Sequence, residues 1–314
     1  MPLRSSYRAA AEGAIKTLDI AAFEVQPEAR SMQPIAGAPL LSAASSESMR
    51  EISIVDELGK QRLIYIPSER PLTVLLDGRE LVTLMTLGAS PELLVLGFLI
   101  NQRLIGSAAA LESIAVDWKS ATAAAKRRTA SGDPADPADP ADAAPRAIVA
   151  PRGIASGQGS VFSRLMAQVD SIKLPGSREA RIRRGTLQDL LDVMRQHDTI
   201  HKLARSVHSC GLFQDARLLV SVEDVSRHNA LDTICGWMAL HGISGADKVL
   251  FTTGRLTGEM VIKAAQCGVP IMVSRNGVSA MGYDLAEKFG MMLIGRAVKR
   301  RFICYVGAER LADG

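Results

Sequence analysis

The chain has 314 residues, of which 47% are hydrophobic and only 4% aromatic, and its formal net charge is +4. This length is sufficient for one large domain or two modest ones. The slightly basic balance lacks the clustered excess of positive charge that marks a dedicated nucleic-acid-binding protein. We therefore expect no nucleic acid as a partner, and a basic pocket for an anionic ligand fits the composition better.

The cysteines and the apolar runs point to a cytoplasmic protein. Four cysteines lie far apart in the sequence, and no two of them form a CxxC pair: Cys210, Cys235, Cys267 and Cys304. We therefore expect a reducing compartment, no disulfide framework and no metal site. The first residues lack the apolar core of a secretory signal, and no apolar run approaches the roughly 18 residues that cross a membrane.

Two stretches of biased composition divide the chain. Residues 1–48 are rich in Ala, Ser and Pro, which predicts a mostly disordered leader or, alternatively, an arm that packs on a partner. Residues 121–146 form an exposed insert, because a Pro at every third position of its centre excludes a helix or a sheet interior. The expected ordered parts are a small N-terminal α+β part, residues 49–120, and a larger C-terminal α/β domain, residues 147–314.

The N-terminal part begins with a predicted hairpin that is followed by a helix. Leu72–Leu76 and Leu81–Met85 have the composition of strands, and Asp77-Gly78 between them is a turn signal. The sequence Ser90-Pro-Glu provides a cap residue, a Pro at the first helical position and an acid in the first turn. A helix is therefore expected from this point to about Leu104.

The C-terminal part alternates helical and strand patterns, which predicts an α/β sheet with helices on both faces. Open sheets of this kind bind ligands at the carboxyl ends of their strands. The predicted helices are Thr186–His197, Asn229–Leu240, Gly258–Gln266 and Ser279–Phe289. The predicted strands are Leu218–Val222, Lys248–Thr252, Ile271–Ser274, Met292–Gly295 and Phe302–Tyr305.

The densest group of polar side chains follows the first of these strands. Six polar or ionisable residues occur within ten positions, where the strand hands over to a helix: Glu223, Asp224, Arg227, His228, Asn229 and Asp232. Burying so many polar groups is costly unless they are hydrogen-bonded or used. The run therefore indicates one wall of a functional site.

A second strand end has the outline of an anion-binding turn. Thr253, Gly254 and Arg255 precede a helix that starts near Thr257. Gly254 lets the backbone approach a ligand, and the free N–H groups of a helix start favour an anion. Arg255 can fork onto a phosphate, although the Walker pattern is absent. The alternative is an ordinary turn in which Arg255 pairs with Glu259.

Two further segments add basic residues and histidines. The segment after Met292–Gly295 could receive a pyrophosphate through its four basic residues, and the alternative is a solvated basic hairpin. His208 and His228 come from different junctions that could meet at one sheet edge, where an imidazole suits proton transfer near neutral pH. The alternative for each histidine is a structural hydrogen bond.

Several of these motifs resemble one known family, the FdhD/NarQ formate dehydrogenase accessory proteins. The run Glu223-Asp-Val-Ser-Arg-His-Asn-Ala-Leu-Asp232 resembles the EDVGRHNAxDK signature of that family. Thr253-Gly-Arg-Leu-Thr-Gly-Glu-Met260 is similar to its SGR/TGR-x-[ST]-x-EM motif, and Ser206-Val-His-Ser-Cys210 resembles its GG-x-H segment. The resemblance covers roughly residues 50–310, without the insert.

The resemblance implies a larger domain with a cytidine deaminase-like sheet and a sulfurtransferase activity. The expected activity passes persulfide sulfur from an IscS-like cysteine desulfurase to the Mo-bis(molybdopterin guanine dinucleotide) cofactor of formate dehydrogenase, and GDP should mimic that cofactor. A homodimer is expected, as is common for proteins that hand on a large cofactor. The residues implied for the chemistry are Ser156, His208 and His228. The residues implied for cofactor binding are Glu223, Asp224, Arg227, Asn229, Thr253, Gly254, Arg255, Arg296, Ala297, Val298, Lys299, Arg300 and Arg301.

One position departs from the family pattern. The family carries sulfur on a cysteine of a Gly-rich loop, and the corresponding loop, residues 155–160, has Ser156 at that position. A hydroxyl cannot hold a persulfide, because the thiolate is the group that attacks and carries sulfur. The chain is then a Cys→Ser variant, a paralogue that binds the cofactor without transferring sulfur, or a protein in which another cysteine, such as Cys210, carries the sulfur.

Two functions follow, and a third is poorly supported. The leading one is a sulfuration factor for the molybdenum cofactor of formate dehydrogenase, and the alternative is a non-catalytic cofactor-binding chaperone. A zinc deaminase would need H-x-E and P-C-x-x-C motifs, and neither occurs in the sequence.

Overall fold

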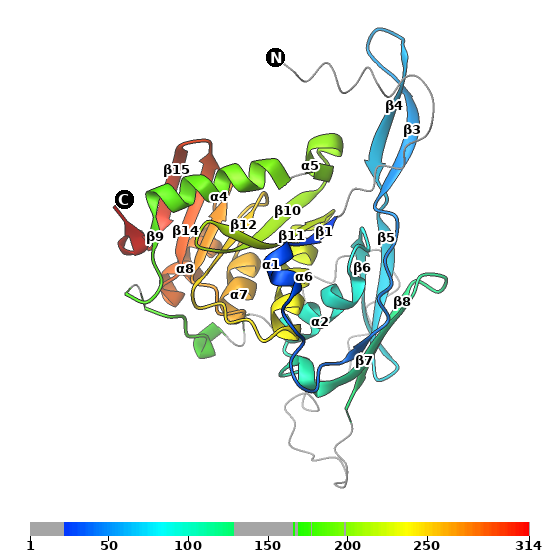
Figure 1. The fold of residues 1–314 in the computed structure, drawn as a ribbon, viewed down its shortest axis with the longest axis horizontal. Helices are drawn as coiled ribbons and strands as arrows, with labels where there is room; N and C mark the ends of the chain where they lie inside the picture. Colours follow the sequence, from blue (N-terminus) through cyan, green and yellow to red (C-terminus); the bar gives the residue numbers. More distant parts are fainter. Residues whose placement is uncertain (1–21, 129–165, 167–168, 177, 198, 314) are drawn as a thin grey trace.

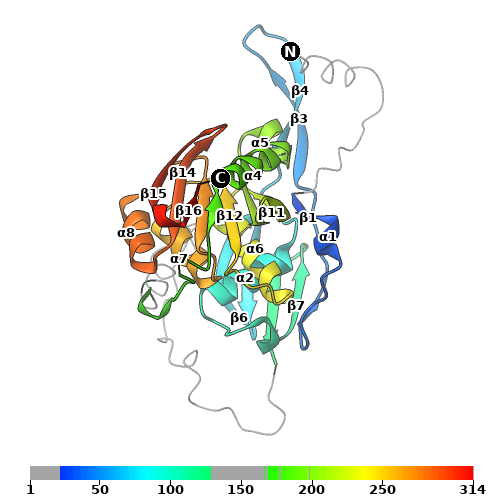
Figure 2. The same cartoon turned by 60° about the vertical axis from the view of Figure 1, so that its left-hand side comes forward.

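The protein consists of two parts that lie side by side (Figures 1 and 2). The structure is a computed structural model, and it describes residues 22–128, 166, 169–176, 178–197 and 199–313. The larger part is built on a seven-stranded sheet and the smaller part on a five-stranded sheet. The predicted loop with Ser156 lies outside the described residues. Among the helices of the described chain, none is both long enough and apolar enough to span a membrane.

The large sheet has the strand order β1-β11-β10-β12-β13-β14-β15. Strands β12, β13 and β14 are parallel, and the other neighbouring pairs are antiparallel. The carboxyl ends of the parallel strands therefore share one edge, where open sheets bind ligands. The strands are β1 Phe23–Val25, β10 His208–Gln214, β11 Arg217–Asp224, β12 Lys248–Thr252, β13 Ile271–Ser274, β14 Met292–Val298 and β15 Arg301–Val306.

Helices cover both faces of this sheet, as the sequence predicts. Leu212 and Val220 belong to the core beneath α6, α7 and α8, whereas Phe213 and Phe251 belong to the core beneath α4. Neighbouring residues of β10 thus face opposite sides, as a pleated strand requires. The finer expectation of a cytidine deaminase-like sheet stays a prediction. The helices are α4 Arg184–His197, α5 Thr199–Ala204, α6 Arg227–Leu240, α7 Gly258–Gln266 and α8 Ala280–Phe289.

The smaller part combines a sheet in the order β2-β7-β8-β5-β6 with a hairpin, β3–β4, that projects from the body (Figure 1). The predicted hairpin of this part is confirmed as β5–β6, and the predicted helix is confirmed as α2, with Pro91 as its first residue. Its elements are β2 Leu40–Leu41, β3 Met49–Val55, β4 Gln61–Pro67, β5 Arg70–Leu76, β6 Arg79–Thr86, α2 Pro91–Asn101, β7 Leu111–Asp117 and β8 Thr122–Arg127.

The two parts are joined by very close packing of α2 against α6. A Cβ atom at Gly97 would lie 1.8 Å from the carbonyl oxygen of Asp232, and one at Gly236 would lie 2.0 Å from the carbonyl oxygen of Leu93. Only glycine leaves room for helix backbones at this separation. Buried apolar residues of both helices fill the rest of the contact.

The expectation of a disordered leader is wrong for residues 22–48. β1 pairs with β11, with Phe23 opposite Val222, and β2 pairs with β7. Between them, the short helix α1 Pro27–Arg30 buries Ala29. β1 is three residues long and β2 is two residues long. Strands this short are held in place by pairing with their partner strands, and their own composition does not predict them. Residues 1–21 lie outside the described chain.

The start of the insert is also predicted too early. Residues 122–127 form β8, which lies between β5 and β7 in the smaller sheet. The Ala-rich sequence of β8 hides this strand, because Ala favours helices and is depleted in strands. The rest of the predicted insert, from residue 129, lies outside the described residues.

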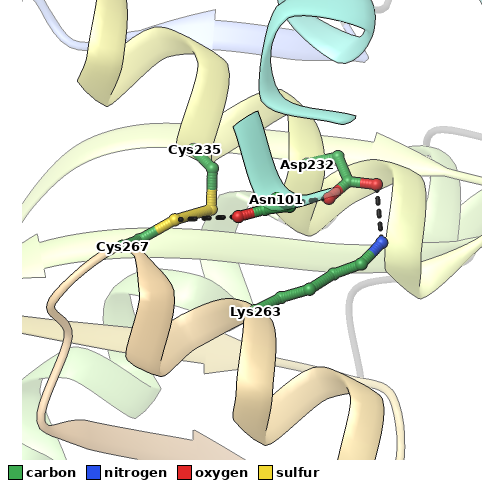
Figure 3. Close-up of a disulfide and its surroundings, with 5 residues drawn as sticks. All are labelled: Asn101, Asp232, Cys235, Lys263 and Cys267. Atoms are coloured by element: carbon green, nitrogen blue, oxygen red, sulfur yellow. Dashed lines mark hydrogen bonds and ion pairs between the residues drawn. A yellow bond between two sulfur atoms is a disulfide. The ribbon is translucent and has the colours of Figure 1, made fainter. Parts of the chain in front are cut away.

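The expectation of no disulfide is wrong as well, since Cys235 of α6 and Cys267 at the end of α7 form one (Figure 3). The two helices pack against each other, so cysteines separated by 32 residues have Cα atoms only 6.1 Å apart. This separation is within the range that a disulfide requires. The spacing of these two cysteines along the sequence could not predict the disulfide, because the packing of α6 against α7 brings them together.

Candidate anion-binding site

The carboxyl ends of β12, β13 and β14 are tied together by hydrogen bonds. The side-chain amide of Asn276 donates to the carbonyl oxygen of Thr253 at 2.6 Å, and the hydroxyl of Ser274 donates to that of Gly254 at 2.6 Å. The N–H of Arg296 donates to the carbonyl oxygen of Asn276 at 2.9 Å. Predicted residues from three separate junctions therefore meet at one edge of the sheet.

Strand β10 brings a fourth segment to the same edge. His208 lies opposite Asp224 of β11, and Cys210 lies opposite Thr252 of β12. The hydroxyl of Thr253 accepts a hydrogen bond from a β10 backbone N–H at 2.9 Å. The Thr253 side chain therefore holds two strands together, and its predicted contact with a cofactor stays a prediction.

Two arginines and a glycine form the cationic centre of this edge. A Cβ atom at Gly254 would lie 2.6 Å from Cδ of Arg227, so the Arg227 side chain crosses directly over this backbone. Burial lowers the pKa of Arg227, and the positive charge of Arg255 lowers it further. The charge of Arg255 thus acts unfavourably on the charge of Arg227, and an anion between the two guanidinium groups would relieve this repulsion.

Both predicted histidines lie beside these arginines and are neutral at physiological pH. Burial is the main cause that lowers the pKa of His208, and neighbouring cationic groups lower it further. Burial also lowers the pKa of His228 to about 2, with the charge of Lys263 as the next cause. Nδ1 of His228 lies 3.5 Å from Oε1 of Glu259. Because the imidazole is neutral, this contact is not an ion pair, and its geometry also falls short of a hydrogen bond.

Helices α6 and α7 both begin at this edge and leave polar atoms without partners. The Ser226 hydroxyl caps α6 by accepting the N–H of His228 at 3.3 Å, whereas Thr257 at the start of α7 makes no such bond. Among the described residues, three buried atoms here lack a hydrogen-bond partner: Nε of Arg227, Nδ1 of His228 and Oγ1 of Thr257. Such orphaned atoms are uncommon and need a partner such as a ligand or water.

The carboxylates of Glu223 and Asp224 hold the fold together. Glu223 accepts two backbone N–H groups at the start of α5, at 2.8 and 2.9 Å. Asp224 accepts the Thr86 hydroxyl at 2.6 Å and the Asn229 amide at 2.9 Å, and that amide also donates to the carbonyl oxygen of Met85. Burial raises the pKa of Asp224, and these hydrogen bonds oppose the rise. The predicted contacts of Glu223, Asp224 and Asn229 with a cofactor stay predictions.

The residues of the predicted basic segment lie on the β14–β15 hairpin and differ in their exposure. Ala297 is 1% exposed, so its side chain contacts the core beneath α4 rather than a ligand, while Val298 is 53% exposed. Lys299, Arg300 and Arg301 are exposed at the tip. This is the solvated basic hairpin that the sequence offered as an alternative, and cofactor binding by its residues stays a prediction.

Sequence reasoning missed the buried ion pairs that support the site. Nζ of Lys263 lies 2.7 Å from Oδ2 of Asp232 and 3.6 Å from Oε1 of Glu259. Among the ion pairs of the described chain, Glu259 is thus joined to Lys263 rather than to Arg255, which was the alternative for that turn. The only sequence signal is the spacing of four residues between Glu259 and Lys263, which places both on one helix face.

Fold and site together define a mixed α/β protein with a candidate anion-binding edge at the carboxyl ends of its parallel strands. The model of the FdhD/NarQ family matches residues 67–312. The chain therefore belongs to the FdhD/NarQ family.

Two similar curated proteins are both named "Sulfur carrier protein FdhD". The one from Bacillus pumilus (strain SAFR-032) is 28% identical over 248 residues, which cover 79% of this chain and 90% of the relative. The one from Bacillus subtilis (strain 168) is 29% identical over 246 residues, which cover 78% and 90%. A crystal structure from Desulfotalea psychrophila, described as a formate dehydrogenase accessory protein, has a TM-score of 0.64 at 23% identity. It covers 84% of this chain and 98% of its own, and it shows a shared fold.

Proposed function

We propose that this chain is an accessory protein of formate dehydrogenase that binds a phosphorylated, guanine-bearing cofactor as its cargo. The observation that carries the proposal is the set of orphaned buried atoms on Arg227, His228 and Thr257 at the starts of α6 and α7. Guanidinium groups and the free N–H groups of helix starts are the donors that bind phosphate oxygens in proteins. The names of the relatives support formate dehydrogenase as the client.

The cargo that we propose is the Mo-bis(molybdopterin guanine dinucleotide) cofactor. Arg227 and Arg255 would hold a phosphate of this molecule, and Gly254 leaves room for the Arg227 side chain beside its backbone. His228 stays neutral beside them, so its Nδ1 can serve as a hydrogen-bond donor without adding charge. Once inside the client enzyme, the cofactor supplies redox chemistry at molybdenum. GDP carries the same guanine and phosphate groups and is the probe for this site.

Sulfur transfer is the finer part of the proposal. The relatives are named sulfur carriers, and the donor would be an IscS-like cysteine desulfurase that passes a persulfide to a homodimer of this chain. Ser156 stands where the family resemblance places the sulfur-carrying cysteine. A serine cannot carry a persulfide. This residue therefore favours a second candidate function, a chaperone that binds the cofactor and transfers no sulfur.

The binding proposal is tested by calorimetric titration of GDP. Arg255→Ala should weaken binding at least about tenfold, because a charge-assisted hydrogen bond to phosphate contributes about 1.5–3 kcal/mol. Arg79→Ala, which removes an exposed arginine on the β5–β6 turn of the smaller part, is the control and should bind GDP normally. Failure of the unmodified protein to bind GDP, or equal affinities of all three proteins, would reject the site.

The transfer step is tested separately by mass spectrometry. The protein is incubated with a cysteine desulfurase and cysteine, and each cysteine is examined for the mass of one added sulfur. The chaperone predicts no added sulfur on the unmodified chain and a persulfide on the new thiol of Ser156→Cys. A persulfide on any native cysteine would contradict the chaperone and establish a sulfur carrier that uses another residue.

A further inference from the structure

The disulfide between Cys235 and Cys267 joins two helices that both begin at the anion-binding site. Helix α6 starts at Arg227 and α7 starts at Gly258. The cross-link therefore restrains how these two helix starts lie relative to each other. Cys235 is 2% exposed, whereas Cys267 follows the last turn of α7 and is partly exposed. An external thiol would therefore reach the Cys267 sulfur first.

A continuous chain of polar contacts runs from this disulfide towards the site (Figure 3). Sγ of Cys267 lies 3.6 Å from Oδ1 of Asn101, and the amide of Asn101 donates to Oδ1 of Asp232 at 2.7 Å. The ammonium of Lys263 donates to the other oxygen of Asp232 at 2.7 Å. Lys263 also lies 3.6 Å from Glu259, the residue that contacts the site histidine. The chain links helices α2, α6 and α7.

The oxidation state of the disulfide determines which contact Cys267 can make with Asn101. A disulfide sulfur carries no proton, so the approach of Cys267 to Asn101 is a contact without a hydrogen bond. A reduced thiol is a weak donor, and it can hydrogen-bond to the amide oxygen of Asn101. Reduction therefore adds a donor at one end of the polar chain and removes the covalent link between α6 and α7.

We propose that Cys235–Cys267 is a redox-active disulfide whose state sets the affinity of the anion-binding site. Its substrate is a dithiol reductant. One thiolate of the reductant attacks Sγ of Cys267, the S–S bond breaks, and Cys235 leaves as a thiolate that takes up a proton. The second thiolate of the reductant then displaces Cys267, so two electrons and two protons reach the protein and the reductant becomes a disulfide.

The direction of the coupling follows from preorganisation. The oxidised protein holds the starts of α6 and α7 in one arrangement, and a preorganised site loses less entropy when a ligand binds. The oxidised form therefore binds GDP more tightly than the reduced form. Coupling between two sites is reciprocal, so GDP must stabilise the disulfide by the same factor. The predicted effect of the disulfide on GDP affinity rests on the proposed function.

Reciprocity provides the test. GDP is titrated by calorimetry into protein equilibrated with oxidised or with reduced dithiothreitol, and the midpoint potential of the disulfide is measured with and without saturating GDP. We expect about tenfold weaker binding after reduction. The midpoint potential should then be about 30 mV more negative with GDP, because tenfold corresponds to 29.6 mV for a two-electron couple. Equal affinities and equal potentials would overturn the coupling.

Cysteine variants serve as matched controls. Cys235→Ser combined with Cys267→Ser should bind GDP as the reduced protein does and should show no response to the redox buffer. Cys304→Ser removes a thiol of β15 that is outside both the disulfide and the polar chain, and it should keep the full response. A redox response that survives in the double variant would assign the effect to another group and overturn the proposal.

A readout without GDP separates this inference from the proposed function. The imidazole resonances of His228, assigned by comparison with His228→Gln, are recorded by NMR in the oxidised and reduced protein. If GDP binds neither form and the resonances still shift on reduction, the proposed function fails and the coupling stands. If the resonances are unchanged by reduction and GDP binds both forms equally, the proposed function stands and the coupling is rejected.

Discussion

Lys263 of α7 forms an ion pair with Asp232 of α6, and the two side chains are only 3% and 2% exposed. The second oxygen of Asp232 accepts the amide of Asn101, which comes from α2 in the smaller part. One buried carboxylate thus holds together three helices and both parts of the protein. Removing one partner of such a pair is far more damaging than the pair itself is stabilising, because a buried charge is left uncompensated.

We therefore expect Lys263→Met to lower the free energy of unfolding by about 3–5 kcal/mol. Combining it with Asp232→Asn removes the stranded charge and should recover a large part of this loss. Urea titration of the single and double variants measures both values. Lys288→Met breaks an exposed pair with Asp170 and should cost no more than about 1 kcal/mol. A double variant less stable than Lys263→Met would contradict the argument.

The crossing of α2 and α6 makes a second prediction. Gly97→Ala would place a methyl group 1.8 Å from the carbonyl oxygen of Asp232, so the helices must separate. Overpacking of this kind costs about 1–3 kcal/mol or more, and thermal unfolding measures it. Gly185→Ala is the control in helix α4, where a Cβ atom meets nothing within 4 Å. That change should stabilise the protein slightly, because Ala favours a helix over Gly.

A third prediction concerns the backbone beneath Arg227. Gly254→Ala would put a Cβ atom 2.6 Å from Cδ and 2.9 Å from Cβ of Arg227. The side chain must move, so GDP affinity should fall about tenfold, the value of one charge-assisted hydrogen bond. Gly277→Ala lies near the same sheet edge, and its Cβ atom meets nothing within 4 Å. Calorimetry should find normal binding for that variant, and matching affinities for the two alanines would exclude Arg227 from the site.

The pKa of His228 predicts how stability depends on pH. Its folded pKa, about 2, is below the ordinary value of 6.5. Between these two pH values, His228 is protonated in the unfolded chain and neutral in the folded protein. The contribution of neutral His228 to the free energy of unfolding is therefore fully present above pH 6.5, and it is lost as the pH falls from 6.5 towards 2. His228→Gln should reduce the slope by up to about 1.4 kcal/mol per pH unit.

Denaturant titrations between pH 4 and 8 measure this slope. The slope should not vanish in His228→Gln, because the pKa of His208 is also lowered and that group continues to titrate. Parallel stability curves for the variant and the unmodified protein would show that His228 has the same pKa in the folded and unfolded states, which would contradict the argument.

Local patterns were sufficient to predict much of the larger part. Strands β12 and β13 and helix α7 begin and end at the predicted residues, because apolar runs bounded by glycine or small polar residues mark them clearly. Strand β10 is absent from the predicted strands, because the sequence places His208 only at a junction and gives no clear strand pattern there. Its order depends on β11 and β12, which flank it on both sides.

The functional role of the site stays a prediction, and its contacts could not be read from the sequence. The density of polar residues from Glu223 to Asp232 predicts a junction of importance, and the structure buries four of these side chains, Glu223, Asp224, Asn229 and Asp232. Whether a carboxylate faces a ligand or the fold depends on segments far away in the sequence, such as Thr86 for Asp224. The same limit applies to the Cys235–Cys267 disulfide, which depends on how α6 and α7 pack.

Strand β1 has a consequence for any shortened form of this protein. It occupies the edge of β11, where Phe23 and Val25 pair with Val222 and Val220. The family match begins only at residue 67, so a chain trimmed to that boundary would leave the backbone groups of β11 unpaired. Such an edge recruits strands from other molecules. We therefore expect light scattering of a form that begins at residue 67 to reveal aggregates, because the free edge of β11 would pair with other molecules.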